Sequence, residues 1–194
     1  MSAITPHPSL ENVFWASLDE KGKKLATKNL APGCKAYVDE WVIEEGGTEY
    51  RVWDPYRSKL AAAILKGLKE IPIKNAAKVL YLGAASGTTA SFVSDVVGAG
   101  GRVYCVEISS RPFRDLLLLC GKRPNMLPIL ADAREPSSYA SLVSEVDVIY
   151  QDVAQPDQVD IFLKNVKMFL IEGGRALLAI KAVSYTHLTL PTKA

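Results

Sequence analysis

Residues 78–89 read KVLYLGAASGTT, and this stretch is the strongest indication of the fold class. An apolar run ending at Leu82 leads into a loop of small residues, Gly83-Ala-Ala-Ser-Gly87, and a helical pattern follows from Thr89. Strand, tight turn and helix are therefore expected in succession. Such a loop lets backbone N–H groups and a helix N-terminus approach a ligand closely. Only Gly83 and Gly87 are present, so the loop is not the Gly-x-Gly-x-x-Gly dinucleotide fingerprint.

A regular alternation continues from this stretch toward the C-terminus. Strands are expected over residues 79–82, 102–108, 126–131, 146–151 and 175–180. Helices are expected over residues 89–97, 110–120, 138–144 and 159–170. Strands that alternate with helices predict βαβ units, an α/β fold with a parallel, Rossmann-like sheet. Ligands of such sheets bind at the edge where the strands end.

The residues before this alternation are β-rich. Short runs with β-branched or aromatic residues occupy residues 12–17, 23–26, 40–44 and 48–53, and turn signals separate them. We therefore expect a small N-terminal β subdomain over residues 1–53 and a second domain over residues 54–182. Asp54-Pro55 is predicted to open a helix that covers residues 57–68, because proline fits the first helical turn.

The last residues do not continue the pattern. After Lys181 the chain reads AVSYTHLTLPTKA, where a helix and further strands are expected. Residues 183–194 resemble translated adapter sequence, so they are interpreted as a non-native tail. On this interpretation the last strands of the sheet are missing and an edge is left exposed.

The composition of the chain argues against several classes of function. The chain has 194 residues and a net charge of +2, which argues against nucleic-acid binding by bulk charge. Cys34, Cys105 and Cys120 have no metal-site spacing and are interpreted as buried, reduced thiols. His7 and His187 have no ligand-like neighbours, so no metal site is predicted. Neither a signal core nor a membrane-spanning stretch is readable.

Acidic residues follow three strands at the ligand-binding edge. Glu107 ends the second predicted strand, where a carboxylate can accept both ribose hydroxyls of a nucleoside cofactor. Asp132, with Ala133 beside it, could accept an adenine amino group, but helix capping explains it as well. Asp152 follows the fourth strand, and capping is again the alternative. Lys181 ends the fifth strand, and Lys59 lies on the preceding helix, where a solvated lysine is the default.

Several blocks resemble the fibrillarin family of box C/D guide-RNA 2′-O-methyltransferases. These are RVWDPYRSKLAAAI at residues 51–64, YLGAASGTTASFVSD, VYCVEIS, ADAR and YQDVAQPDQ. The resemblance covers roughly residues 10–182 in order. It implies an S-adenosylmethionine (SAM)-dependent methyltransferase fold with a small N-terminal β subdomain. It also implies transfer of a methyl group to a ribose 2′-OH in rRNA and tRNA.

The resemblance assigns roles to individual residues. It places Lys59, Asp152 and Lys181 in a catalytic lysine/aspartate set. A lysine of this set would accept or relay the hydroxyl proton, while Asp152 holds that lysine and steers the hydroxyl. The loop and strand-end residues implied to bind SAM are Gly83, Ala85, Thr88, Thr89, Glu107, Ile108, Asp132, Ala133, Asp152, Val153, Ala154 and Gln155.

The resemblance also implies partners. They are a box C/D guide RNA with its target rRNA or tRNA, a Nop-family scaffold protein and a kink-turn-binding ribosomal-type protein. No membrane is involved. A cytoplasmic, archaeal-type protein is expected, because the Gly/Arg-rich tail of eukaryotic members is absent from this sequence. Candidate phosphate contacts are Arg51, Arg57, Arg111, Arg114, Lys122, Arg123 and Arg134.

Three other functions remain open at this point. A nicotinamide-dependent oxidoreductase would share the α/β pattern and the acid after the second strand, but the third fingerprint glycine is missing. A non-catalytic subunit of an RNA complex would keep the fold without the chemistry. A methyltransferase of small molecules or protein side chains is disfavoured by the block at residues 51–64.

Overall fold

The computed structural model describes residues 3–17, 22–68 and 70–180, and it contains two five-stranded sheets. The N-terminal sheet is antiparallel, in the order β1-β2-β3-β5-β4. Its strands are β1 (Ile4–Pro6), β2 (Val13–Ser17), β3 (Lys23–Lys28), β4 (Val42–Glu45) and β5 (Thr48–Val52). The sequence did not predict β1, which is short, contains a proline and forms the edge of the sheet.

The second sheet is parallel, as the alternation predicted, in the order β10-β9-β6-β7-β8. Its strands are β6 (Lys78–Leu82), β7 (Arg102–Glu107), β8 (Met126–Leu130), β9 (Val146–Gln151) and β10 (Leu170–Leu178). The helices are α1 (Lys59–Leu65), α2 (Thr88–Val97), α3 (Ser110–Cys120) and α4 (Gln158–Phe169). This is the predicted Rossmann-like architecture with an N-terminal β layer.

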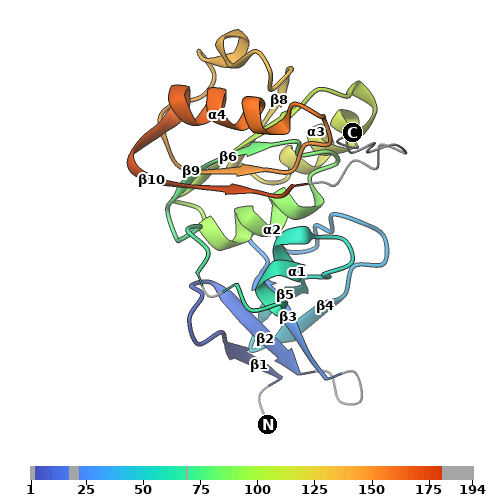
Figure 1. Cartoon of the computed structure of the whole chain (residues 1–194). Coiled ribbons are helices and arrows are strands. Elements are labelled where there is room, and N and C mark those ends of the chain that lie inside the picture. The colour runs from blue at the N-terminus through green and yellow to red at the C-terminus, as the bar shows by residue number, and fades with distance from the viewer. Residues whose placement is uncertain (1–2, 18–21, 69, 181–194) are drawn as a thin grey trace, which may run out of the picture.

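Both faces of the parallel sheet are covered, which is why β6 is apolar and buried after its exposed first residue, Lys78. Val79 and Tyr81 point into a core shared with α1, α2 and the N-terminal sheet. Leu80 and Leu82 point to the other face, into a core shared with α4. Figure 1 shows this layering, with α1 and α2 between the two sheets and α4 on the far side.

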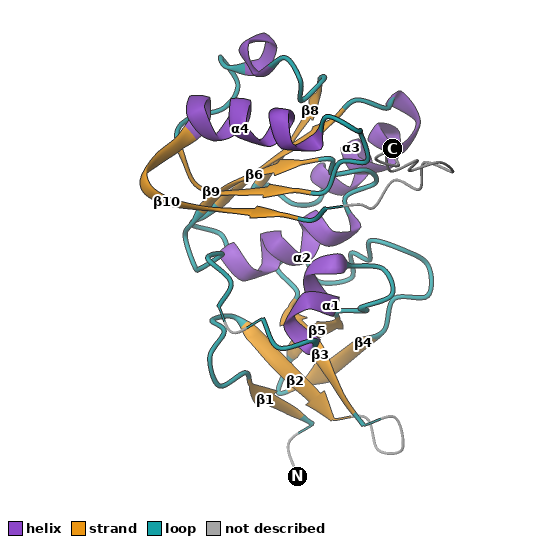
Figure 2. Cartoon of the chain, viewed as in Figure 1, coloured by secondary structure: helices purple, strands orange, loops and turns teal. Residues whose placement is uncertain are grey.

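Two predicted helices differ from the structure (Figure 2). Asp54-Pro55 does not open a helix. Asp54 instead accepts a hydrogen bond from the Tyr56 backbone N–H, and Ser58 caps α1 by accepting one from the Ala61 N–H. Residues 138–144 form no α-helix, only the 3₁₀ turn η2 (Pro136–Tyr139), in which the Ser138 hydroxyl donates to a local carbonyl.

The last strand also differs from the prediction. β10 begins at Leu170 instead of residue 175, and its register with β9 is irregular between Leu170 and Arg175. The glycine pair Gly173-Gly174 lies within this irregularity, which is why the sequence suggested a turn there. Lys181 and the predicted tail at residues 183–194 lie outside the described residues.

Candidate active site

The order of the strands creates a crevice at one edge of the parallel sheet. From β6 the chain moves outward through β7 to β8, and it then returns to the other side of β6 with β9 and β10. At such a switch point, the loops after neighbouring strands diverge and leave room for a ligand. A cavity of about 200 Å³ lies there.

Ten of the twelve residues expected to bind the cofactor line this cavity. They are Gly83, Ala85, Glu107, Ile108, Asp132, Ala133, Asp152, Val153, Ala154 and Gln155. Val106, Ala131 and Ile161 also line it and were not predicted. Val106 and Ala131 adjoin predicted residues, so strand-end position was a usable signal, whereas Ile161 lies on α4 and offered none.

The loop after β6 needs both of its glycines. Gly83 has φ +81°, and a Cβ there would lie 2.7 Å from the Asp152 carbonyl oxygen. Gly87 has φ +88°, and a Cβ there would meet the Leu116 side chain at 2.8 Å. The loop can therefore pass close to the β9 loop and to α3 only without side chains at these positions.

Glu107 is buried and is held in place by the backbone. Its carboxylate accepts hydrogen bonds from the Ala85 N–H (2.8 Å) and the Ser109 N–H (2.7 Å). Each carboxylate oxygen keeps a further lone pair, since an oxygen of this type can accept two hydrogen bonds. Glu107 is thus a fixed acceptor in the cavity wall that could receive a pair of neighbouring hydroxyls.

Asp132 lies on the rim and binds a neighbouring arginine. Its carboxylate accepts hydrogen bonds from the Arg134 backbone N–H and guanidinium at 2.9 to 3.1 Å. These contacts, led by the side-chain hydrogen bond, hold the pKa of the Asp132 carboxyl below its ordinary value. Asp132 caps a turn and not an α-helix, because only the 3₁₀ turn η2 follows.

Lys59 and Asp152 meet across 93 residues of sequence. The Lys59 Nζ lies 2.9 Å from Asp152 Oδ1 and 3.0 Å from Oδ2. The lysine side chain is 50% exposed and the aspartate side chain 15%, so the ion pair sits at the cavity mouth. Lys59 is exposed, as the default for a helix lysine predicts, and its ammonium also has a specific carboxylate partner. We refer to these residues as the Lys59–Asp152 pair.

Besides Lys59, which contacts the lining residue Asp152 without lining the cavity itself, three expected residues do not line it. Thr88 and Thr89 form the first turn of α2 and do not line it, and Thr89 is buried. Lys181 falls outside the described residues. Among the described residues, no group of His, Cys, Asp or Glu is arranged to hold a metal ion. Cys34, Cys105 and Cys120 are buried and free, as predicted.

Two of the predicted phosphate contacts are wrong. Arg51 and Arg123 are fully buried, and both donate to the carboxylate of Asp95 on α2. Arg51 also binds Glu40. Although burial opposes it, the neighbouring carboxylates hold the pKa of Arg51 above its ordinary value. We refer to Glu40, Arg51, Asp95 and Arg123 as the buried ion cluster; it joins the N-terminal sheet to the α2 layer.

The remaining candidates are on the surface. Arg111, Arg114 and Lys122 are exposed on or after α3. Arg57 binds Asp39 at 3.1 Å, and Arg134 binds Asp132. These five positions can therefore reach a solvent-side ligand. No helix in the described part of the chain is long and apolar enough to cross a membrane.

Comparison with known proteins identifies the family. A sequence profile of the family Fibrillarin matches residues 4–194. The fibrillarin-like rRNA/tRNA 2′-O-methyltransferase of Methanopyrus kandleri is 52% identical over 181 residues, which is 93% of this chain and 78% of that protein.

Solved structures agree with the profile match. Aeropyrum pernix fibrillarin with natively bound S-adenosyl-L-methionine superposes with a TM-score of 0.90 at 49% identity, over 93% of this chain and 78% of that one. The fibrillarin of a fibrillarin/Nop5p complex gives 0.73 at 43% identity, over 87% and 74% of the two chains. This chain belongs to the fibrillarin family.

Proposed function

We propose that this chain is a SAM-dependent RNA 2′-O-methyltransferase that acts on rRNA and tRNA within a box C/D guide-RNA complex. The observation that carries the proposal is the Lys59–Asp152 pair at the mouth of the strand-end cavity. Family membership and the relatives named as rRNA/tRNA 2′-O-methyltransferases support it.

The cavity has a chemistry that suits SAM. Glu107 presents a fixed carboxylate for ribose hydroxyls, and Asp132 with Ala133 forms a wall suited to adenine. The buried side-chain oxygen of Gln155, which lines the cavity, has no hydrogen-bond partner among the described residues and could accept from a ligand donor. Gly83 and Ala85 would border the methionine part, and Thr88 and Thr89 would support the loop from α2.

The protein residues have a limited task, because bound SAM supplies a methyl group that its sulfonium has already activated. The 2′-hydroxyl must be oriented in line with that methyl group and must lose its proton. Asp152 would accept a hydrogen bond from the hydroxyl while it holds Lys59. The proton would pass to the Asp152 carboxylate or to a lysine of the set in its neutral form, and Lys181 also belongs to this set. Val153, Ala154 and Ile108 would exclude water from the reacting atoms.

We also propose partners for this enzyme. A modest net charge suits a protein that relies on a guide RNA for target choice. The relative solved with Nop5p supports a Nop-family scaffold as the partner that holds the enzyme. A kink-turn-binding protein would complete the complex. Arg57, Arg111, Arg114, Lys122 and Arg134 would contact RNA phosphates, and the site of action would be the cytoplasm.

A calorimetric titration tests the cofactor first. The folded chain should bind SAM, and NAD serves as the control for the oxidoreductase alternative. Methyl transfer to a guide-paired target would then be measured in the assembled complex. SAM binding without transfer would favour a non-catalytic subunit, and a folded chain that binds NAD but not SAM would refute the proposal.

A further inference from the structure

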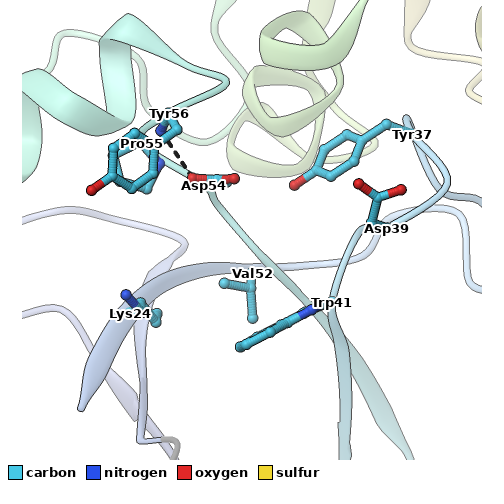
Figure 3. Close-up of a pocket in the computed structure, with 8 residues that line it drawn as sticks. All are labelled: Lys24, Tyr37, Asp39, Trp41, Val52, Asp54, Pro55 and Tyr56. Atoms are coloured by element: carbon cyan, nitrogen blue, oxygen red, sulfur yellow. Dashed lines mark hydrogen bonds between the residues drawn. The ribbon is translucent and has the colours of Figure 1, made fainter. Parts of the chain in front are cut away.

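A second cavity, of about 230 Å³, lies where the N-terminal sheet meets the turn before α1. It shares no lining residue with the strand-end cavity. Its lining residues, drawn in Figure 3, form what we term the aromatic–acidic pocket: Lys24, Tyr37, Asp39, Trp41, Val52, Asp54, Pro55 and Tyr56.

One side of this pocket already binds a guanidinium group. Arg57 donates from Nη2 to the Asp39 carboxylate at 3.1 Å, and its Cζ lies 4.4 Å from the centre of the Tyr37 ring. A planar, weakly hydrated guanidinium binds well to a carboxylate combined with an aromatic face. The chain itself therefore shows which chemical group these residue types select.

The other side offers the same combination with no cation bound. One Asp54 oxygen accepts the Tyr56 N–H at 2.9 Å, and among the described residues no cation lies within ion-pair distance of this carboxylate. Tyr56 is 96% exposed. Figure 3 shows Tyr37 and Tyr56 on either side of Asp54.

The electrostatics of the pocket favour a positive ligand. Burial raises the pKa of Tyr37 to about 12, and Glu40 and Asp54 contribute to the rise. Two carboxylates line the pocket; Arg57 already pairs with Asp39, so Asp54 is the carboxylate left for a ligand, and Lys24 is the one cation among the lining residues. A nucleobase in the pocket would bring its phosphate toward the Asp54 carboxylate, which has no cation at ion-pair distance among the described residues, and this disfavours a nucleobase as the occupant.

We propose that the aromatic–acidic pocket binds the guanidinium of an arginine side chain on a partner protein. Asp54 forms the ion pair, and the Tyr56 ring covers the planar group. The surroundings suit a protein interface, because Trp41 and Val38 are also exposed and aromatic residues are enriched among binding hot spots. This site is separate from methyl transfer, so the two assignments can fail independently.

A peptide titration followed by NMR tests the proposal. The probe is the capped tripeptide acetyl-Gly-Arg-Gly-amide, and the same peptide with citrulline is the neutral control. We expect saturable shifts at the indole N–H of Trp41 with the arginine peptide, and at least about tenfold weaker binding of the citrulline peptide. Asp54→Asn should weaken arginine binding about tenfold and Tyr56→Ala about two- to fivefold.

Matched controls separate binding from folding. Asp115→Asn removes an exposed carboxylate on α3 and should leave the arginine titration unchanged. Tyr56→Ala alters an exposed side chain, so it tests the pocket even if the Asp54 variant is unstable. Equal binding of the arginine and citrulline peptides would overturn the proposal. Stronger shifts with uridine monophosphate would identify a nucleobase site instead. SAM titration of the same samples reports on the cofactor site separately.

Discussion

The buried ion cluster and the Lys59–Asp152 pair both join carboxylates to cationic side chains, but they differ in burial and in role. In the cluster, Asp95 accepts from two arginines, from the Thr27 hydroxyl and from the Leu30 N–H, with no solvent access to any of the charged side chains. In the pair, Asp152 lines a cavity and binds a half-exposed lysine. A fully satisfied buried carboxylate has no capacity left for chemistry, whereas one at a cavity mouth can exchange partners.

The cluster also shows what holds the two sheets together. Arg51 comes from β5 and packs its guanidinium 4.1 Å from the ring of Phe92 on α2. Arg123 donates to Asp95 and, at 2.7 Å, to the Asn29 side chain near the end of β3. The cluster therefore fixes the position of the N-terminal sheet against the cofactor-binding half.

The largest expected effect comes from breaking the cluster. Asp95→Asn leaves two buried arginines without their shared carboxylate and should lower the free energy of unfolding by about 3–5 kcal/mol. Urea denaturation followed by circular dichroism measures this change. Asp115→Asn, which removes an exposed carboxylate, is the control and should change stability by less than about 0.5 kcal/mol. A similar small change for Asp95→Asn would contradict the structural role.

The next largest effect is expected on the rate of methyl transfer, with little change in the stability of the fold. Lys59→Met should lower methyl transfer in the assembled complex at least about 100-fold, equivalent to about 2.7 kcal/mol, because proton removal loses its lysine. Its stability should change by less than about 1 kcal/mol, since the lysine is half-exposed. SAM affinity should stay near that of the unmodified chain. Full transfer activity in this variant would exclude Lys59 from the mechanism.

A smaller effect is the salt dependence of the interactions in the Lys59–Asp152 pair, compared with those in the buried ion cluster. A double-mutant cycle on Lys59 and Asp152 should give a coupling free energy of about 0.2–1 kcal/mol at low salt. At 1 M salt this coupling should approach zero, because a Debye length of about 3 Å screens exposed charges. The destabilisation by Asp95→Asn should hardly change with salt. Equal salt sensitivity at both sites would contradict the assigned difference in burial.

The smallest effect concerns Asp132 on the cavity rim. Arg134→Gln should raise the pKa of the Asp132 carboxyl toward its ordinary value of 3.8, because the guanidinium hydrogen bond is lost. A depressed carboxyl pKa contributes stability that is present above the ordinary value and lost as pH falls through the folded-state value. This acid-side loss should therefore diminish in Arg134→Gln. A carbon-13 NMR titration of Asp132 measures the pKa, and an unchanged value would contradict the contact.

The sequence predicted most accurately those helices and strands whose own residues carry a clear hydrophobic pattern. Residues 110–120 and 146–151 form α3 and β9 as predicted, since amphipathic periodicity and an apolar run are properties of the segment itself. The start of α1 was misplaced because Asp54 and Ser58 are both good capping residues, and local sequence does not decide between them. The helix predicted over residues 138–144 failed for a similar reason, because serines also form local turns.

The parallel α/β layout and the positions of Glu107, Asp132 and Asp152 at the strand ends could be read from the order of residues alone. Strand ends share one sheet edge whatever the details of packing. Which charges are buried became clear only from the folded structure. Arg51 and Arg123 look like surface cations in the sequence but contact Asp95, and Lys59 looks solvated but meets Asp152. These contacts join residues far apart in the chain, so they depend on packing that no local pattern contains.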